Sequence, residues 1–187
     1  MNVIIFGPPG AGKGTQALNI VKKFNLHQIS TGDLLRTEIK NKSEIGKEIE
    51  EVISKGDFAT DDIVNKLIKN IIFDTKKKDK LIFDGYPRSL SQAKNLDLLL
   101  NSSNQKIDFI FFLNVNKDTI IKRIEKRKIL EKRSDDDLNT ILKRYDAYME
   151  TTTPVLDFYL KNKNFYEIDG SEEIDVISSK IEQILRV

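Results

Sequence analysis

The chain has 187 residues, the size of one domain with a sizeable core. Its 31 basic and 29 acidic side chains leave a net charge of +2, which excludes the basic excess of a dedicated nucleic-acid binder. Cysteine is absent, so disulfides, thiolate zinc sites and cysteine nucleophiles are excluded too. The first residues show no signal-peptide pattern, and no apolar run is long enough to cross a bilayer. We therefore expect a cytoplasmic protein that binds neither membranes nor nucleic acid.

Short apolar runs alternate with longer segments of helical period along the chain. Five runs predict strands, at residues 3–6, 27–29, 81–83, 107–113 and 165–168. None of them alternates strictly between apolar and polar residues, which is typical of strands covered on both faces. The predicted fold class is α/β, a doubly wound five-stranded parallel sheet. His27, the only histidine, falls in one of these strands, so we expect it to be buried and structural.

Apolar residues at helical spacing predict helices near residues 45–53, 63–72, 138–145 and 174–184. Thr60, which precedes two aspartates, is expected to cap the helix near residues 63–72. Ser134 is expected to cap the helix near residues 138–145. Two helices follow each other within residues 30–59 with no strand between them. This segment is therefore expected to project from the sheet as a small helical subdomain, and the charged residues 128–137 are expected to form an exposed loop.

The most specific motif is GPPGAGKGT, from Gly7 to Thr15, directly after the first predicted strand. It fits the phosphate-loop pattern G-x-x-x-x-G-K-[ST], except that Gly14 stands where a hydroxyl is usual. Glycines let backbone N–H groups surround a phosphate, the following helix adds its positive end, and Lys13 adds a full charge. The alternative is a glycine-rich turn that only joins a strand to a helix.

Two further motifs follow the second and third predicted strands. Because the carboxyl ends of parallel strands share one edge of a sheet, both should face the same crevice as the glycine loop. In STGDLLR, from Ser30 to Arg36, the polar residues also have an explanation as helix caps. In DGYPR, Asp84 is placed to hold hydrated Mg²⁺ and Arg88 to bind an anion with two hydrogen bonds.

Gln92 has two interpretations of about equal weight. It stands three residues after Ser89, the spacing of a capping box, and it is also placed to contact a ligand.

The arginines near the charged loop also have two interpretations. They are either solvated surface charges or groups that neutralise a phosphate in transfer. They are Arg123, Arg127, Arg133 and Arg144.

Together, GPPGAGKGT, STGDLLR, DGYPRSLSQA and the RSDD segment resemble the adenylate kinase family of nucleoside monophosphate kinases, in order and spacing, from Val3 to Gly170. The resemblance implies a P-loop NTPase core formed by residues 1–29, 60–126 and 138–187. It also implies a domain for the acceptor nucleotide at residues 30–59 and a short lid at residues 127–137, which lacks the zinc site found in some long lids.

The resemblance also implies roles for individual residues. The ATP site comprises Gly10, Ala11, Gly12, Lys13, Gly14, Thr15, Arg123, Arg127 and, through its backbone, Glu172. The AMP site comprises Thr31, Arg36, Asp57, Phe58, Ala59, Gly85, Tyr86, Pro87, Arg88, Gln92, Arg133 and Arg144. The groups expected to act in catalysis are Lys13, Asp84, Arg88, Arg127, Arg133 and Arg144. Mg²⁺ is expected to arrive with ATP and to be held through the nucleotide and water, with Asp84 behind the water and no direct protein ligand.

The implied reaction is MgATP + AMP ⇌ 2 ADP by a monomer that binds ATP, AMP and ADP. Two alternatives stay open at this point. A UMP/CMP kinase of the same fold is distinguished by Thr31 and Gln92, which suit an adenine pocket. A nucleotide sensor that binds ATP without transferring phosphate would not need the second set of arginines.

Overall fold

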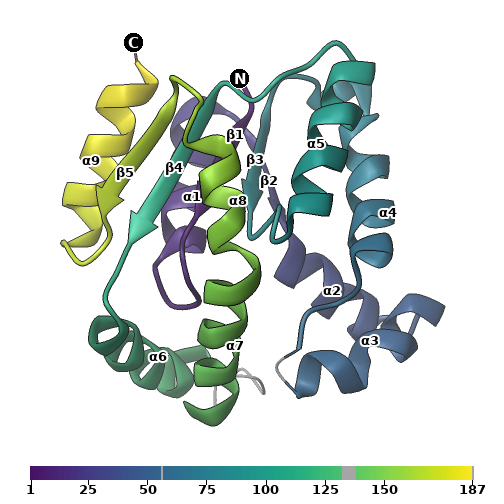
Figure 1. Cartoon of the computed structure of the whole chain (residues 1–187), viewed down its shortest axis with the longest axis vertical. Coiled ribbons are helices and arrows are strands. Elements are labelled where there is room, and N and C mark those ends of the chain that lie inside the picture. Colours follow the sequence, from purple (N-terminus) through teal and green to yellow (C-terminus); the bar gives the residue numbers. More distant parts are fainter. Residues whose placement is uncertain (56, 132–137, 187) are drawn as a thin grey trace.

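The computed structural model describes residues 1–55, 57–131 and 138–186. Its centre is a five-stranded sheet in which every neighbouring pair is parallel, in the order β2-β3-β1-β4-β5 (Figure 1). The strands are β1 (Val3–Phe6), β2 (His27–Ser30), β3 (Leu81–Asp84), β4 (Phe109–Asn114) and β5 (Phe165–Asp169). The predicted doubly wound parallel sheet is therefore confirmed.

Helices surround the sheet and connect its strands. In chain order they are α1 (Lys13–Phe24), α2 (Thr31–Lys40), α3 (Glu44–Ser54), α4 (Asp61–Ile72), the short 3₁₀ turn η1 (Thr75–Lys77), α5 (Leu90–Ser102), α6 (Lys117–Glu131), α7 (Leu138–Thr151), α8 (Thr153–Tyr159) and α9 (Ile174–Leu185). Helices α2 and α3 follow each other without a strand, as predicted. None of the described helices combines the length and the apolar composition that crossing a membrane requires.

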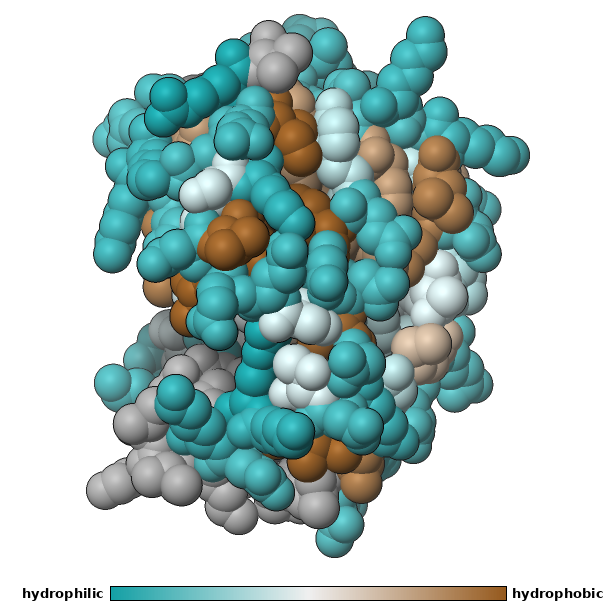
Figure 2. All heavy atoms as spheres, turned by 90° about the vertical axis from the view of Figure 1, so that its left-hand side faces the viewer, coloured by the Kyte–Doolittle hydropathy of each residue, from teal (hydrophilic) through white to brown (hydrophobic). Residues whose placement is uncertain are grey.

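Alternate residues of the central strands enter two separate cores. Ile4 and Phe6 of β1 pack on one face with α4, α5 and α8, while Val3 and Ile5 pack on the other with α1, α6 and α9. Burial on both faces explains why these strands lack polar alternation in the sequence. On the flank that Figure 2 shows, hydrophobic residues emerge in separate groups within a mostly hydrophilic surface.

The structure corrects three details of the sequence interpretation. His27 is exposed, because it begins β2, which lies at an edge of the sheet. The fourth strand begins at Phe109 rather than at residue 107, after Asp108 has turned to accept a hydrogen bond from the Asn2 main chain. Thr60 does stand at the start of α4, but its side chain makes no capping hydrogen bond. Ser134 lies outside the described residues.

A tight contact joins the two helices of the projecting segment. A Cβ atom at Gly46 in α3 would lie 2.1 Å from the main-chain oxygen of Glu38 in α2. Only glycine allows the two backbones to approach this closely. Ser43 fixes the start of α3, because its Oγ accepts a hydrogen bond of 2.9 Å from the Gly46 amide. The segment is thus a packed helix pair, and in Figure 1 it lies beyond the carboxyl ends of the strands.

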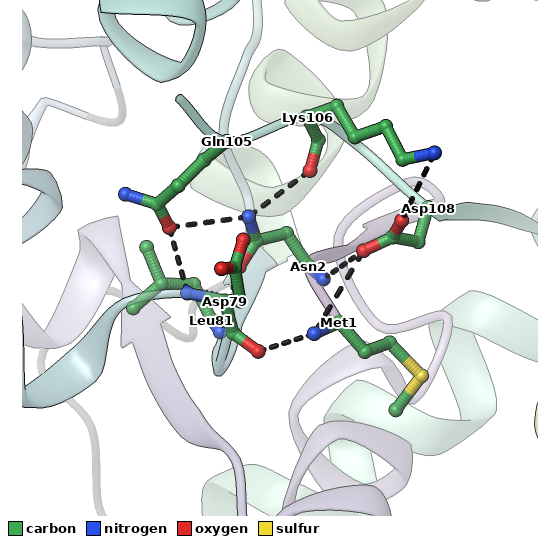
Figure 3. Close-up of polar contacts among 7 residues, drawn as sticks. All are labelled: Met1, Asn2, Asp79, Leu81, Gln105, Lys106 and Asp108. Atoms are coloured by element: carbon green, nitrogen blue, oxygen red, sulfur yellow. Dashed lines mark hydrogen bonds and ion pairs between the residues drawn. The ribbon is translucent and has the colours of Figure 1, made fainter. Parts of the chain in front are cut away.

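At the opposite end of the sheet, Asn2 joins the beginnings of three strands (Figure 3). Its side chain is fully buried. Its Oδ1 accepts a hydrogen bond from the Leu81 amide at 3.1 Å, and its Nδ2 donates to the Lys106 carbonyl at 3.0 Å. The Gln105 side chain extends the network, since its Oε1 accepts from the Asp79 amide at 2.8 Å. This cluster braces the end of the sheet that faces away from the crevice.

We expect Asn2→Leu to lower Tm without affecting catalysis. Leucine has a similar size but leaves the Leu81 amide and the Lys106 carbonyl unsatisfied, at a cost of about 1–3 kcal/mol for each buried group. Thermal unfolding should then shift downward by about 5–10 °C. Lys106→Ala, which removes only an exposed side chain, is the matched control and should leave Tm within about 2 °C. An unchanged Tm in the Asn2 variant would contradict the bracing role.

Candidate active site

A cleft of about 910 Å³ opens at the carboxyl ends of the strands. The glycine loop after β1 lines one part of it, and the segments that follow β2 and β3 line another. Helices α6 and α7 and the loop before α9 contribute the remaining walls. The crevice predicted from parallel strand ends is therefore present, and the three motifs face it together.

The glycine loop has the shape of a phosphate cradle. Gly10 and Gly12 have φ values of +84° and +92°, which residues other than glycine rarely adopt. A Cβ at Gly10 would press to 3.0 Å from Ile120 and Ile124 of α6, so the loop packs closely on that helix. Lys13 opens α1 and donates hydrogen bonds to the Gly7 and Pro8 carbonyls at 2.8 and 3.0 Å. Its ammonium group thus lies beside the loop and the positive end of a helix.

Asp84 lies at the end of β3, close to the glycine loop. A Cβ at Gly14 would lie 3.5 Å from the Asp84 Oδ2 atom, so the absent side chain leaves this carboxylate facing the start of α1. Gln28 Nε2 donates to the same oxygen at 3.0 Å. The described residues contain no group of three or more metal-ligating side chains. A single carboxylate near a phosphate loop fits Mg²⁺ that keeps its waters, and it does not fit a metal enclosed by protein.

Arg88 is held in a fixed position on the other side of the cleft. Its Nε donates to the Gly85 carbonyl at 2.7 Å, and its guanidinium group lies 4.5 Å from the centre of the Phe58 ring. Thr31 Oγ1 donates to the same Gly85 carbonyl at 2.8 Å. The buried hydroxyl of Thr152 donates to the Arg88 carbonyl at 3.1 Å. Arg88 is therefore placed by its neighbours before any ligand arrives.

Two neighbouring guanidinium groups act on Arg88 in this part of the cleft. Burial, and then the positive charges of Arg144 and Arg36, lower the pKa of Arg88 to about 10, while Asp84 opposes this. Arg36 also forms an ion pair of 2.6 Å with Asp33. Repelling cations that gather in a half-buried cleft favour an anionic ligand, since a phosphate can bind several of them at once.

Gln92 forms only half of the predicted capping box, and its contact with a ligand stays a prediction. Its main-chain N–H donates a hydrogen bond to Ser89 Oγ at 3.1 Å, which is one half of the box. Its side chain does not return to Ser89, however. The Oε1 atom accepts from the Arg88 main-chain N–H at 2.8 Å, and Nε2 donates to Asp61 Oδ1 at 2.7 Å. Gln92 is only 4% exposed, yet it lines the cleft.

Tyr86 lies differently from the other residues of its motif. Its side chain is buried in the core, and its hydroxyl donates to Asn65 Oδ1 at 2.7 Å. Burial raises the pKa of Tyr86 to about 12. Gly85, Pro87 and Arg88 line the cleft on either side of it. Any contact of Tyr86 with a ligand would therefore use its backbone.

Arg123 connects the phosphate loop to the segment after β5. Its Nη1 donates to the Gly170 carbonyl at 2.7 Å and to the Ala11 carbonyl at 3.4 Å, and its Nη2 donates to the Glu172 carbonyl at 3.4 Å. The Glu172 carboxylate pairs with Lys180 of α9 at 2.6 Å. The acidic side chain is therefore neutralised, and the Glu172 backbone lines the cleft.

Helix α7 contacts the segment that joins α3 to α4. Lys143 forms an ion pair of 2.7 Å with Asp57 and donates to the Lys55 carbonyl at 3.1 Å. Arg144 Nη2 donates to the Ile53 carbonyl at 3.4 Å. The structure thus places Arg144 in the cleft with Asp57, Phe58 and Ala59. Arg127 belongs to α6, and Arg133 and most of the predicted lid lie outside the described residues.

Sequence reasoning missed several residues of the cleft. Tyr148 is one of them: its side chain is 7% exposed, and its hydroxyl makes no hydrogen bond of normal geometry with the described residues. Burial raises the pKa of Tyr148, and the nearby Gly7 amide opposes this. Its position four residues after Arg144, on the same face of α7, is the signal that points to it. Thr152 and Gln28 also line the cleft and give no such local signal. The same holds for Lys143 and Asp61, which contact residues of the cleft without lining it.

Comparisons with known proteins agree with this geometry. A family model described as adenylate kinase matches residues 5–164. The chain belongs to the adenylate kinase family. An adenylate kinase of Pelagibacter ubique (strain HTCC1062) is 50% identical over 213 aligned positions, with both chains fully covered. One of Caulobacter sp. (strain K31) is 38% identical over 187 positions, with 100% of this chain and 99% of the relative covered.

Membership of the adenylate kinase family confirms the resemblance inferred from the motifs. It also makes the protein an enzyme, and thereby argues against the nucleotide sensor. The P-loop NTPase type of the α/β fold agrees with the strand order and with the loop that follows β1. The phosphate-loop interpretation of GPPGAGKGT is thus preferred to a simple turn.

We expect Lys13→Met to remove most activity while secondary structure is retained. The ammonium group donates to the Gly7 and Pro8 carbonyls of the phosphate loop, so its full charge lies where a phosphate would bind. Loss of one such group from an enclosed site lowers kcat by about 10²-fold or more. Steady-state kinetics together with circular dichroism check this. Lys22→Met makes the same charge change at an exposed position in the last turn of the same helix and is the control. Near-normal turnover of the Lys13 variant would exclude a catalytic loop.

Proposed function

We propose that the protein transfers the terminal phosphoryl group of MgATP to AMP and gives two ADP. One observation carries this proposal: the phosphate loop and the arginine cluster around Arg88 line the same cleft. Each provides a binding place for one phosphate chain. A kinase that phosphorylates a nucleotide needs both, because the donor and acceptor phosphates must meet in line.

On the donor side, the amides of Gly10 to Thr15 and the Lys13 ammonium group hold the phosphates of ATP. The flat guanidinium group of Arg123 stacks on the donor adenine. Its fixed position supports this role, since it is hydrogen-bonded to the carbonyls of Gly170, Ala11 and Glu172. The Glu172 backbone contacts the edge of the same base.

On the acceptor side, Arg36 and Arg88 bind the phosphate of AMP. Thr31 and Gln92 contact its base. The pocket between them is formed by residues 57–59 and 85–88, of which the exposed Asp57 is engaged by Lys143. The rigid placement of Arg88 supports its role, because a group that is positioned in advance loses less entropy when the phosphate binds.

Magnesium accompanies ATP in this proposal and neutralises the charge of its phosphates. Asp84 is the residue that would hold it, through a water molecule. The Gln28 hydrogen bond fixes the Asp84 carboxylate toward the phosphate loop. Zinc plays no part in the proposal, because the chain has no cysteine and a single histidine, and that histidine is exposed at the edge of the sheet.

The transfer itself is a displacement at the γ-phosphorus of ATP. An oxygen of the AMP phosphate forms a new bond to this phosphorus, while the bond to the bridging oxygen breaks and ADP leaves with that oxygen. The acceptor is already anionic, so no general base is required. Arg88, Arg144, Arg127 and Arg133 neutralise the moving charge, the last two on the strength of the resemblance alone.

We propose that residues 30–59 and residues 127–137 close over the two nucleotides and exclude water. The contacts of Lys143 and Arg144 with residues 53–57 support this proposal, because they show that α7 reaches the helical segment. The short lid rests on the resemblance, since only five residues separate Arg127 from Arg133 in this chain. The monomeric state and the cytoplasmic location stay predictions.

Acceptor choice separates this proposal from a UMP/CMP kinase. We expect kcat/KM for AMP to exceed that for CMP and UMP strongly, because unpaired polar groups can reject a wrong base by about 10⁴- to 10⁵-fold. Gln92→Leu should reduce this preference mainly by impairing AMP. The measurement is coupled-assay kinetics with each acceptor, with Tm recorded for both proteins.

A purely structural Gln92 gives a different result. Loss of its bonds to Arg88 and Asp61 would then lower Tm but leave the preference among acceptors unchanged. Equal use of CMP and AMP by the unmodified protein would contradict the adenylate assignment itself.

A further inference from the structure

The Gln92 side-chain amide is held at both of its ends. Its Nε2 donates to Asp61 Oδ1 at 2.7 Å, and its Oε1 accepts from the Arg88 main-chain N–H at 2.8 Å. Asp61 is the first residue of α4, and its second oxygen accepts from Ser89 Oγ at 2.7 Å. The carboxylate is thus fixed between the starts of two helices, and the amide is fixed against it.

The chemistry of these partners determines which way the amide faces. A carboxylate only accepts hydrogen bonds, and a main-chain N–H only donates them. If the amide turned over, its carbonyl oxygen would face the Asp61 carboxylate and its NH₂ group would face the Arg88 N–H. Both hydrogen bonds would become repulsive contacts between partly buried groups, which is unfavourable.

The locked amide still has one hydrogen-bonding position at each end. An amide nitrogen has two hydrogens and an amide oxygen has two lone pairs, and Asp61 and Arg88 use one of each. A neighbouring donor and acceptor fit the edge of adenine, where a ring nitrogen accepts and an exocyclic amine donates. Hypoxanthine has the reverse order at these two positions, since its ring nitrogen donates and its oxygen accepts. An amide that rotates freely could bind both bases, whereas a locked amide binds only the base whose donor and acceptor stand in the matching order.

We propose that Asp61 is a specificity-determining positioning residue: it locks the Gln92 amide in the order that matches adenine and mismatches 6-oxopurines. The inference rests on the proposed role of Gln92 in contacting the acceptor base. Asp61 itself acts through Gln92. It gives the enzyme a means to choose between purines of nearly equal size, which a pocket cannot separate by shape alone.

The test is the ratio of kcat/KM for AMP to that for IMP in Asp61→Asn. Asparagine has nearly the same shape but can either accept or donate, so it tolerates both orientations of the amide. The ratio should fall about tenfold, because one of the two hydrogen bonds that lock the amide no longer selects an orientation. Asp62→Asn makes the same charge change at the next, exposed position of α4 and should leave the ratio unchanged.

If Asp61 only stabilises the fold, the result differs. Asp61→Asn would then lower Tm and reduce kcat/KM for both nucleotides equally, and an unchanged ratio in folded protein would overturn the inference. Asp61→Ser provides the same test if the asparagine variant does not fold, because a hydroxyl also donates or accepts.

Gln92→Leu separates this inference from the function on which it rests. If that variant loses the preference for AMP over IMP while Asp61→Asn retains it, the inference about Asp61 fails and the assignment of Gln92 stands. If Gln92→Leu leaves the preference intact, both fail together.

Discussion

The site depends on the register of β3 between its two neighbours. Asp84, the last residue of β3, is paired with Ile5 of β1 on one side and with Ser30 of β2 on the other. This register places the segment after β3 between the phosphate loop and the start of α2. The Gly85 carbonyl then accepts hydrogen bonds from both Thr31 and Arg88. A shift of one residue would move Asp84 and Arg88 away from their places beside the phosphate loop and the start of α2.

The cleft keeps a local excess of positive charge within a chain that is nearly neutral overall. Arg144 and Arg36 help to lower the pKa of Arg88, so these cations lie close together at some electrostatic cost. Such a cost is offset when a phosphate binds, so ligand binding should also stabilise the folded chain. The Asn2 cluster at the opposite end of the sheet braces the fold where no ligand is required. Stability and reactivity thus reside at opposite ends of the same strands.

The sequence predicts those parts of the fold and site that local pattern determines. Five apolar runs predict the strands, and the glycines with Lys13 predict the loop after β1, because their spacing has a direct physical meaning. Contacts between distant side chains have no such signal. Asp61 precedes Gln92 by 31 residues, and nothing nearby indicates that their side chains meet. The exposure of His27 was missed for a related reason, since strand order alone decides which strand lies at the edge.

The central claim is that one cleft brings two nucleotides together for direct transfer. The most direct measurement incubates the protein with AMP and MgATP whose γ-phosphate carries an isotope label, and then follows each phosphate by NMR. The account predicts two ADP for every ATP and AMP consumed, with the label in the β-phosphate of the ADP formed from AMP. Label that appears as inorganic phosphate, or ATP that binds and is not consumed when AMP is present, would contradict it.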